Sequence, residues 1–301
     1  MMTMTKFRLP PPIADSLPPA VTSRIFELAA AGTFSGDELT EIRLRTARPA
    51  SLSAAGNNLR LGVTVSAAEM ADTVASLCRG SVYAHDADIR EGYIRMEGGI
   101  RVGVCGTMAG KGVRDITSLN IRIPHAIRGV CEPILPLMEE GLRSLLIHSP
   151  PGVGKTTLLR DLAARLAMTR RVVLMDTRGE LYMPELFADT LCDVLTGYPR
   201  ALGIEIATRT LSPEVIVCDE LGDLDEARGL LTAVNTGVPI IATAHAADAA
   251  ELTARPNIRL LHDNGVFDAY VGIARERIGG RLSRSFTCSV HRRDEAIPCR
   301  A

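Results

Sequence analysis

The stretch HSPPGVGKTTLLRDLA, residues 148–163, joins a short apolar run to a helical pattern through a loop rich in glycine and proline. Residues 149–156 match the phosphate-loop pattern G-x-x-x-x-G-K-[ST] at every fixed position except the first, where Ser149 replaces glycine. Serine lacks the conformational freedom of glycine, so the loop must begin in a conformation that an L-residue accepts. The stretch therefore predicts a strand, a phosphate-binding loop and a helix in succession.

The types of residue in this loop suit a nucleoside triphosphate. Gly152 and Gly154 let backbone N–H groups turn toward phosphates, and the start of the following helix adds partial positive charge. Lys155 is expected to reach the β- and γ-phosphates, and Thr156 to place its hydroxyl on Mg²⁺. The expected nucleotide-binding residues are Pro151, Gly152, Val153, Gly154, Lys155, Thr156 and Thr157.

A second apolar run, EVIVCDE at 214–220, ends in two consecutive acids. Ligands of open α/β sheets bind at the carboxyl ends of the strands, where these acids fall. Asp219 suits the shell of Mg²⁺ together with Thr156, and Glu220 suits a base that orients and polarises the attacking water. A glutamate at this position favours hydrolysis over a passive switch.

A third apolar run, VPIIATAH at 238–245, places Thr243 and His245 at the end of another strand. Polar side chains there can contact the γ-phosphate or the attacking water, so we assign both residues a catalytic, sensing role. The alternative for His245 is a hydrogen-bonded histidine that only ends a strand.

These runs, together with RSLLIHS at 143–149 and RVVLMD at 171–176, alternate with helical patterns. Strands buried on both faces of a parallel sheet have this composition, with helices as crossovers. Residues 144–301 are therefore expected to form a P-loop ATPase domain of RecA-like or AAA type, with a mainly parallel sheet.

The first part of the chain has a different pattern and is expected to be an α+β domain over residues 1–143. After a Pro-rich lead-in at 1–20, expected to be extended, the patterns predict two helices, one ending at Gly32 and one capped by Ser66. Alternation predicts a half-buried strand around residues 38–52 and a hairpin at 91–106 that turns at two glycines. This region has no phosphate cradle, acid pair or metal-ligand spacing, so we assign it no chemistry.

Composition narrows the class of protein further. The chain has 301 residues, a net charge of −1 and 34 basic against 35 acidic residues, which argues against a surface-wide field for nucleic acid. Seven cysteines without a CxxC pair suit reduced thiols in a cytosol. The first residues lack the apolar region of a signal peptide, and no window reaches the roughly 18 apolar residues of a membrane span. Any membrane association is expected to be peripheral.

The chain resembles the stage III sporulation protein AA family, P-loop ATPases of endospore-forming bacteria related to secretion and pilus motor ATPases. The resemblance extends from about residue 38 to 275. It is carried, in family order, by the blocks LTEIRLRTARP, REGYIRMEGGIRVGVCG, ITSLNIRIPHAIRG, PPGVGKTTLLRDLA, DVLTGYPRALG, RTLSPEVIVCDELGD and IATAHA. The blocks before the phosphate loop are the most specific, because many unrelated proteins share such a loop.

The resemblance implies an ATPase that uses ATP and Mg²⁺ in a homo-oligomeric, hexameric ring, with nucleotide between protomers. It implies a cytoplasmic protein on the mother-cell side, at the cytoplasmic face of a membrane, with membrane-embedded channel proteins as partners. Glu180 matches an acid near the nucleotide of related motors, and Arg209 matches a motor arginine; a scaffold role is equally open for both. Thr177 stands where an acid is expected, and Ser149 where glycine is expected.

Two other functions stay open. A nucleic-acid-dependent ATPase is disfavoured by the neutral charge and by the lack of aromatic residues among Arg43, Arg45 and Arg48, although a late basic cluster exists. Its members are Arg275, Arg277, Arg281 and Arg284. A nucleotide-gated scaffold with little turnover is disfavoured by Glu220. No nucleic acid is therefore expected as a partner.

Overall fold

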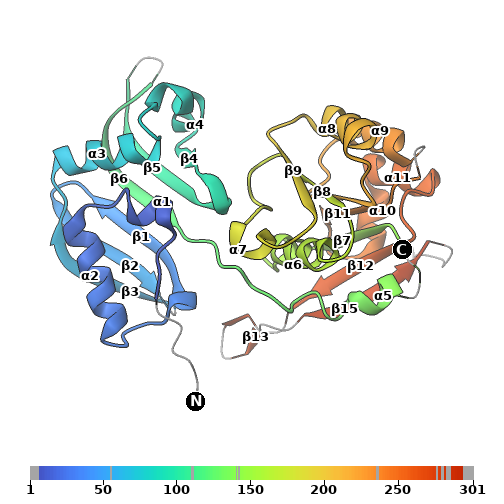
Figure 1. Ribbon diagram of the computed structural model, residues 1–301, viewed down its shortest axis with the longest axis horizontal. Coiled ribbons are helices and arrows are strands. Elements are labelled where there is room, and N and C mark those ends of the chain that lie inside the picture. Colours follow the sequence, from blue (N-terminus) through green and yellow to red (C-terminus); the bar gives the residue numbers. More distant parts are fainter. Residues whose placement is uncertain are drawn as a thin grey trace. The chain divides into compact units, whose positions relative to one another are not determined.

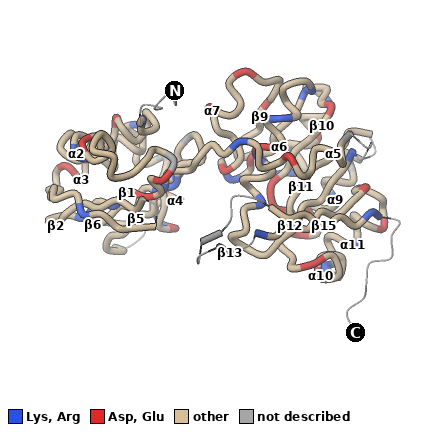
Figure 2. The backbone as a smooth tube through the Cα atoms, turned by 90° about the horizontal axis from the view of Figure 1, so that it is seen from below, with Lys and Arg blue, Asp and Glu red and all other residues tan. Residues whose placement is uncertain are grey.

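The chain folds into two compact units, residues 1–125 and 126–301, in the computed structural model (Figure 1). The structure describes residues 7–54, 56–109, 112–139, 141, 143–234, 237–275, 277–278, 281–282 and 286–293. Arg284, Cys299 and the tail from residue 294 onward lie outside the described residues. Figure 2 shows acidic and basic residues interspersed along both units, as the near-zero net charge suggests.

The first unit contains a six-stranded sheet in the order β3-β2-β1-β6-β5-β4. Every pair of neighbouring strands is antiparallel. The strands are β1 Leu39–Arg45, β2 Arg48–Ala54, β3 Asn57–Thr64, β4 Tyr93–Arg95, β5 Arg101–Ala109 and β6 Gly112–Arg122. The alternation expected around residues 38–52 thus covers two strands rather than one, and Ile42 and Leu44 on β1 are fully buried as predicted.

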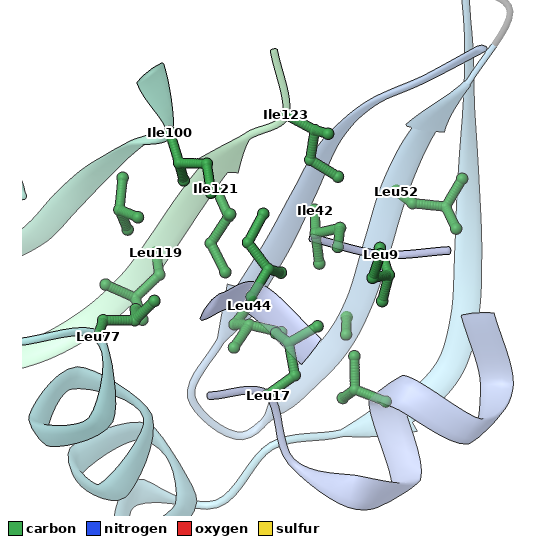
Figure 3. Packing of buried hydrophobic residues seen from close by; sticks show 14 of the residues in the cluster. Leu9, Leu17, Ile42, Leu44, Leu52, Leu77, Ile100, Leu119, Ile121 and Ile123 are labelled. Carbon is green, nitrogen blue, oxygen red and sulfur yellow. The ribbon is translucent and has the colours of Figure 1, made fainter. Parts of the chain in front are cut away.

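Helices cover one face of this sheet and close a single hydrophobic core (Figure 3). The helices are α1 Pro11–Ala14, α2 Pro19–Ala30, α3 Ala67–Leu77 and α4 Asp86–Arg90, and short 3-10 turns lie at Gly36–Glu38, Val82–His85 and Glu97–Gly99. Leu77 from α3, Leu17 before α2 and Leu44 of β1 all belong to this core. Burying each such leucine contributes about 1.5–3 kcal/mol, so this face of the sheet holds the unit together.

Local signals in this unit are largely confirmed. The Ser66 hydroxyl accepts the Glu69 N–H at 3.2 Å and the Glu69 carboxylate accepts the Ser66 N–H at 2.8 Å, which is a capping box at the start of α3. β4 and β5 form the predicted hairpin, and Gly98 and Gly99 have φ angles of 76° and 73°.

Residues 1–6 of the lead-in lie outside the described residues, and residues 7–20 differ from the expected extended form. One helical turn, α1, forms at Pro11–Ala14, because proline is well tolerated in the first turn of a helix. Ile13 from this turn is completely buried in the core. α2 likewise begins with a proline at its first turn, and no side chain caps it.

The second unit contains a seven-stranded sheet in the order β15-β12-β7-β11-β10-β8-β9. Its strands are β7 Leu145–Ser149, β8 Val172–Asp176, β9 Cys192–Thr196, β10 Val215–Cys218, β11 Ile240–His245, β12 Ala269–Ala274 and β15 Thr287–Arg292. All neighbours pair in parallel except β12 and β15. A separate two-stranded ribbon pairs β13 Arg277–Ile278 with β14 Arg281–Leu282. The mainly parallel sheet is confirmed.

Helices cover both faces of this sheet, so the unit has three layers (Figure 1). One core cluster joins α5 Leu135–Glu139, α6 Lys155–Ala167 and α7 Pro184–Phe187 to one face. The other joins α8 Arg200–Ile206, α9 Leu224–Val234, α10 Ala249–Ala254 and α11 Pro256–Asp263 to the opposite face. A π-helical turn, Ala207–Leu211, continues α8.

The division between the units falls earlier than the expected boundary at residues 143 and 144. Cys131, Ile134 and Met138 are buried in the same cluster as α6, so residues 126–143 pack with the second unit. Strands β9, β12 and β15 were not predicted. β9 and β15 are edge strands with partly exposed side chains, and their short apolar patterns carry a weaker signal than the central strands.

Candidate functional site

The phosphate loop connects β7 to α6. β7 is buried along its whole length, and α6 begins at Lys155 immediately after Gly154. Gly152 and Gly154 have φ angles of 77° and 117°, a region that L side chains rarely adopt, so both positions require glycine. Ser149 lies at the end of β7 in extended backbone, paired with His245, and serine therefore fits where the motif has its first glycine.

The Lys155 side chain is almost completely buried at the start of α6. Its ammonium donates to the Ser149 carbonyl at 3.0 Å and lies 2.7 Å from His245 Nδ1. Burial lowers the pKa of Lys155, and the nearby carboxylates of Glu220 and Asp219 oppose that shift. The cation is thus held between loop carbonyls and a histidine, with two acids close by.

The hydrogen bond from Lys155 assigns the tautomer of His245. An ammonium can only donate, so Nδ1 of the imidazole accepts and the proton of the neutral ring resides on Nε2. Nε2 lies 3.3 Å from Glu220 Oε1. The other carboxylate oxygen of Glu220 lies 3.2 Å from Arg178 Nη1. Lys155, His245, Glu220 and Arg178 therefore form one chain of polar contacts.

Asp219 directly follows β10 and is largely buried, with 9% of its surface exposed. Thr243 donates its hydroxyl to Asp219 Oδ1 at 3.1 Å. Thr243 itself is fully buried on β11. The contact fixes the carboxylate at the end of the sheet beside the phosphate loop.

These residues meet because β7, β11 and β10 are neighbours and run in the same direction. Parallel strands end at the same edge of a sheet, so the segments that follow them converge there. A cleft at this edge is lined by Gly152, Gly154, Lys155, Thr156, Asp219, Glu220, Thr243 and His245. Every one of these residues was singled out in the sequence.

The other loop residues named as nucleotide-binding have different positions. Pro151 is exposed, and Val153 and Thr157 are half-buried next to the cleft rather than in its lining. The backbone carbonyl of Val153 accepts a hydrogen bond from Arg275 at 3.3 Å. The structure thus places Arg275, a member of the late basic cluster, against the phosphate loop.

Glu180 lies in the turn that follows β8. Asp176, buried at the end of that strand, accepts the backbone N–H of Glu180 at 2.8 Å and that of Tyr182 at 2.9 Å. Arg160 from α6 donates to the carbonyls of Leu181 and Glu180. Burial lowers the pKa of Arg160, and Asp176 opposes that shift most strongly. The strand therefore ends in a buried acid at position 176, one residue before the position at which an acid was expected.

Arg209 lies outside the lining of the cleft. It lies on the π-helical turn after α8, its side chain is 74% exposed, and it pairs with Glu205 at 2.9 Å. The arginine that reaches Glu220 is Arg178, which sequence reasoning missed. Its only signal was its place two residues before Glu180.

The donors in the cleft suit magnesium. Thr156 offers a hydroxyl and Asp219 a carboxylate, and Mg²⁺ prefers a few oxygen ligands completed by water and phosphate. Within the described ranges, no group of three or more His, Cys, Asp or Glu residues could hold a metal by itself. The six described cysteines are free thiols, three of them buried.

Two solved structures share the fold of this chain. The Legionella pneumophila ATPase DotB matches with a TM-score of 0.65 and 16% identity, over 90% of this chain and 81% of that chain. The pilus retraction motor PilT with bound ADP has the same score and identity, over 90% of this chain and 83% of its own. The chain therefore has the fold of the ATPase DotB and of the pilus retraction motor PilT.

The sporulation stage III protein AA family model matches residues 20–288. The stage III sporulation protein AA of Bacillus subtilis (strain 168) is 32% identical over 292 residues, 91% of this chain and 94% of the relative. The chain belongs to the sporulation stage III protein AA family. No helix within the part of the chain that the structure describes is long and apolar enough to cross a bilayer.

Proposed function

We propose that this protein is a Mg²⁺-dependent ATPase that hydrolyses ATP to ADP and phosphate. One observation supports this most: a buried lysine, a hydroxyl and two consecutive acids line a single cleft beside the phosphate loop. The fold shared with ATPases of secretion and pilus retraction agrees with it.

Nucleotide binding is assigned to the loop and to Lys155. Backbone N–H groups around Gly152 and Gly154 and the start of α6 receive the phosphates, where the helix supplies partial positive charge. The Lys155 ammonium now donates to Ser149 and His245, and it exchanges these partners for phosphate oxygens. Phosphate charge opposes the effect of burial on the Lys155 pKa, so the bound state keeps the lysine protonated.

Thr156 and Asp219 would hold Mg²⁺. The ion, when bound, neutralises the charge that develops on the phosphates. Thr243 donates a hydrogen bond to Asp219 Oδ1 and would thereby keep the carboxylate in place to hold the ion. Thr243 therefore acts on the metal ligand as well as at the end of its strand.

Glu220 is assigned the catalytic base. It accepts a proton from the attacking water, or orients that water, while Arg178 and His245 hold its two oxygens. His245 contacts both Lys155 and Glu220. When Lys155 moves onto a γ-phosphate, His245 loses one of its two partners, and its contact with the catalytic base Glu220 changes. This gives His245 a sensing role.

For the assembled protein we propose a homo-oligomeric, hexameric ring in the cytoplasm of the mother cell. The ring is peripheral at the membrane face, where it energises a channel to the forespore through membrane-embedded partners. Membership of the family and the likeness to secretion ATPases support this proposal. Glu180 is proposed to act near the nucleotide. Arg209 is proposed to act on the nucleotide of a neighbouring protomer, because the Arg209 side chain is exposed.

The test measures initial rates of phosphate release at saturating ATP against protein concentration, with Mg²⁺ and with EDTA. We expect Mg²⁺-dependent release whose specific rate rises with concentration as protomers assemble. If the parent protein releases phosphate no faster than a Glu220→Gln variant at any protein concentration, the proposed ATPase activity is contradicted. A specific rate independent of concentration in a monomeric protein would contradict the shared site.

A further inference from the structure

Two side chains approach the phosphate loop from the side opposite the acids. Arg275 directly follows β12, and Phe286 directly precedes β15, the antiparallel partner of β12. β7 lies between β12 on one side and β11, which carries His245, on the other. Because β12 and β7 are parallel, Arg275 emerges at the edge of the sheet where the loop begins.

Both side chains contact the loop at a single peptide. Arg275 Nη1 donates to the Val153 carbonyl at 3.3 Å, and its guanidinium lies 5.0 Å from the centre of the Phe286 ring. A Cβ placed on Gly154 would lie 3.1 Å from Phe286 Cζ and 3.4 Å from Arg275 Nη1. Gly154 is therefore packed directly against the pair.

The arginine lies on the outer side of the loop. Gly154 lines the cleft, whereas Arg275 and Phe286 do not belong to its lining. Phe286 is 7% exposed and belongs to the core cluster of this unit, so its ring provides a fixed surface beneath the guanidinium. Stacking of a guanidinium on an aromatic ring is favourable and restricts where the arginine can move.

This contact determines the direction of a peptide in the cradle. In a planar trans peptide the C=O and N–H point in opposite directions, so binding the Val153 carbonyl outside directs the Gly154 N–H toward the cleft. Glycine at φ 117° has few steric barriers against rotating that peptide. A rotated peptide would present a carbonyl oxygen to phosphates and repel them.

We propose that Arg275, supported by Phe286, is a positioning residue that holds the Val153–Gly154 peptide in its anion-binding orientation. The inference rests on the proposed nucleotide function of the cleft. Arg275 organises the phosphate loop before the ligand arrives, and the arginine makes no contact with the nucleotide.

The test compares Arg275→Ala, Phe286→Leu and the parent protein by calorimetric titration with ADP and with inorganic tripolyphosphate. Arg275→Ala is expected to weaken both ligands equally, by about tenfold, which is the effect of losing one charge-assisted hydrogen bond. Phe286→Leu keeps the arginine and is expected to weaken both by a smaller, equal factor. In the hydrolysis assay the KM for ATP rises about tenfold, while kcat at saturating ATP stays within about threefold.

Arg228→Ala is the matched control, because it removes an arginine on α9 whose side chain is 66% exposed and pairs with Asp225 on the same helix. It should bind both ligands as the parent does, and thermal unfolding should show that all variants remain folded. If Arg275→Ala binds ADP and tripolyphosphate with the affinity of the parent, this inference is overturned and the proposed function is unaffected. Loss of ADP affinity with unchanged tripolyphosphate affinity would also overturn it, since that result means contact with the nucleoside. A parent that binds neither ligand would overturn the proposed function as well.

Discussion

Replacing Glu220 with glutamine keeps the length and shape of the side chain and removes its basicity. One carboxylate oxygen, 3.2 Å from Arg178 Nη1, or the other, 3.3 Å from His245 Nε2, becomes an amide nitrogen. The amide can retain one of these contacts through its remaining oxygen, so the neighbouring side chains keep their places. The variant therefore separates the chemistry of Glu220 from its packing.

The expected loss lies in turnover rather than in binding. A positioned general base contributes about 10²–10⁴-fold, which corresponds to about 2.7–5.4 kcal/mol of activation free energy. Glu220 lies across the cleft from the loop that receives the phosphates, and glutamine removes a negative charge from that cleft. We therefore expect ATP affinity to be equal to or higher than that of the parent, with bound ATP retained.

Single-turnover phosphate release and filter binding of labelled ATP measure the two effects separately. Glu27→Gln is the matched control, because it makes the same chemical change on α2 at a carboxylate whose side chain is 62% exposed and pairs with Arg24. A Glu220→Gln protein that hydrolyses ATP within about fivefold of the parental rate would refute the assignment, because another group would then position the water.

Three further predictions follow from the same structure. Lys155→Ala should abolish ATP binding in a fluorescence titration, because the phosphates lose their main counter-charge, and unchanged affinity would refute the phosphate-loop assignment. A truncated protein beginning at Ala126, the first residue of the second unit, should bind ATP but assemble poorly and hydrolyse slowly. Its size is measured by light scattering and its activity by an ATPase assay, and a fully active monomer would exclude a ring-building role for the first unit. Arg200→Ala should lower the free energy of unfolding in urea by about 3 kcal/mol, the lower end for a broken buried ion pair, because its partner Glu226 stays 29% exposed. The exposed Arg209→Ala should change it by less than about 0.5 kcal/mol, and equal values for the two arginines would contradict the role of burial.

Features that depend on residues close together in the chain could be recognised from the sequence. The phosphate loop is one segment, and its glycines adopt the positive φ angles that the motif requires. The Ser66 and Glu69 capping box is also local, because its two hydrogen bonds join residues three positions apart. Asp219 and Glu220 follow a buried strand directly, so their place at the edge of a parallel sheet could be inferred without knowing its strand order.

The order of the strands was decided only by the tertiary structure. Strands buried on both faces have similar apolar sequences, and periodicity carries no information about which of them become neighbours. The pairing of β12 with β7 brings Arg275 to Val153 from 122 positions away, although the sequence suggested only a basic cluster. The approach of Arg178 to Glu220 likewise depends on the pairing of β8 with β10, which places the ends of the two strands side by side. Local propensities and short motifs therefore determined the loop and the acids, whereas long-range strand pairing determined which side chains support them.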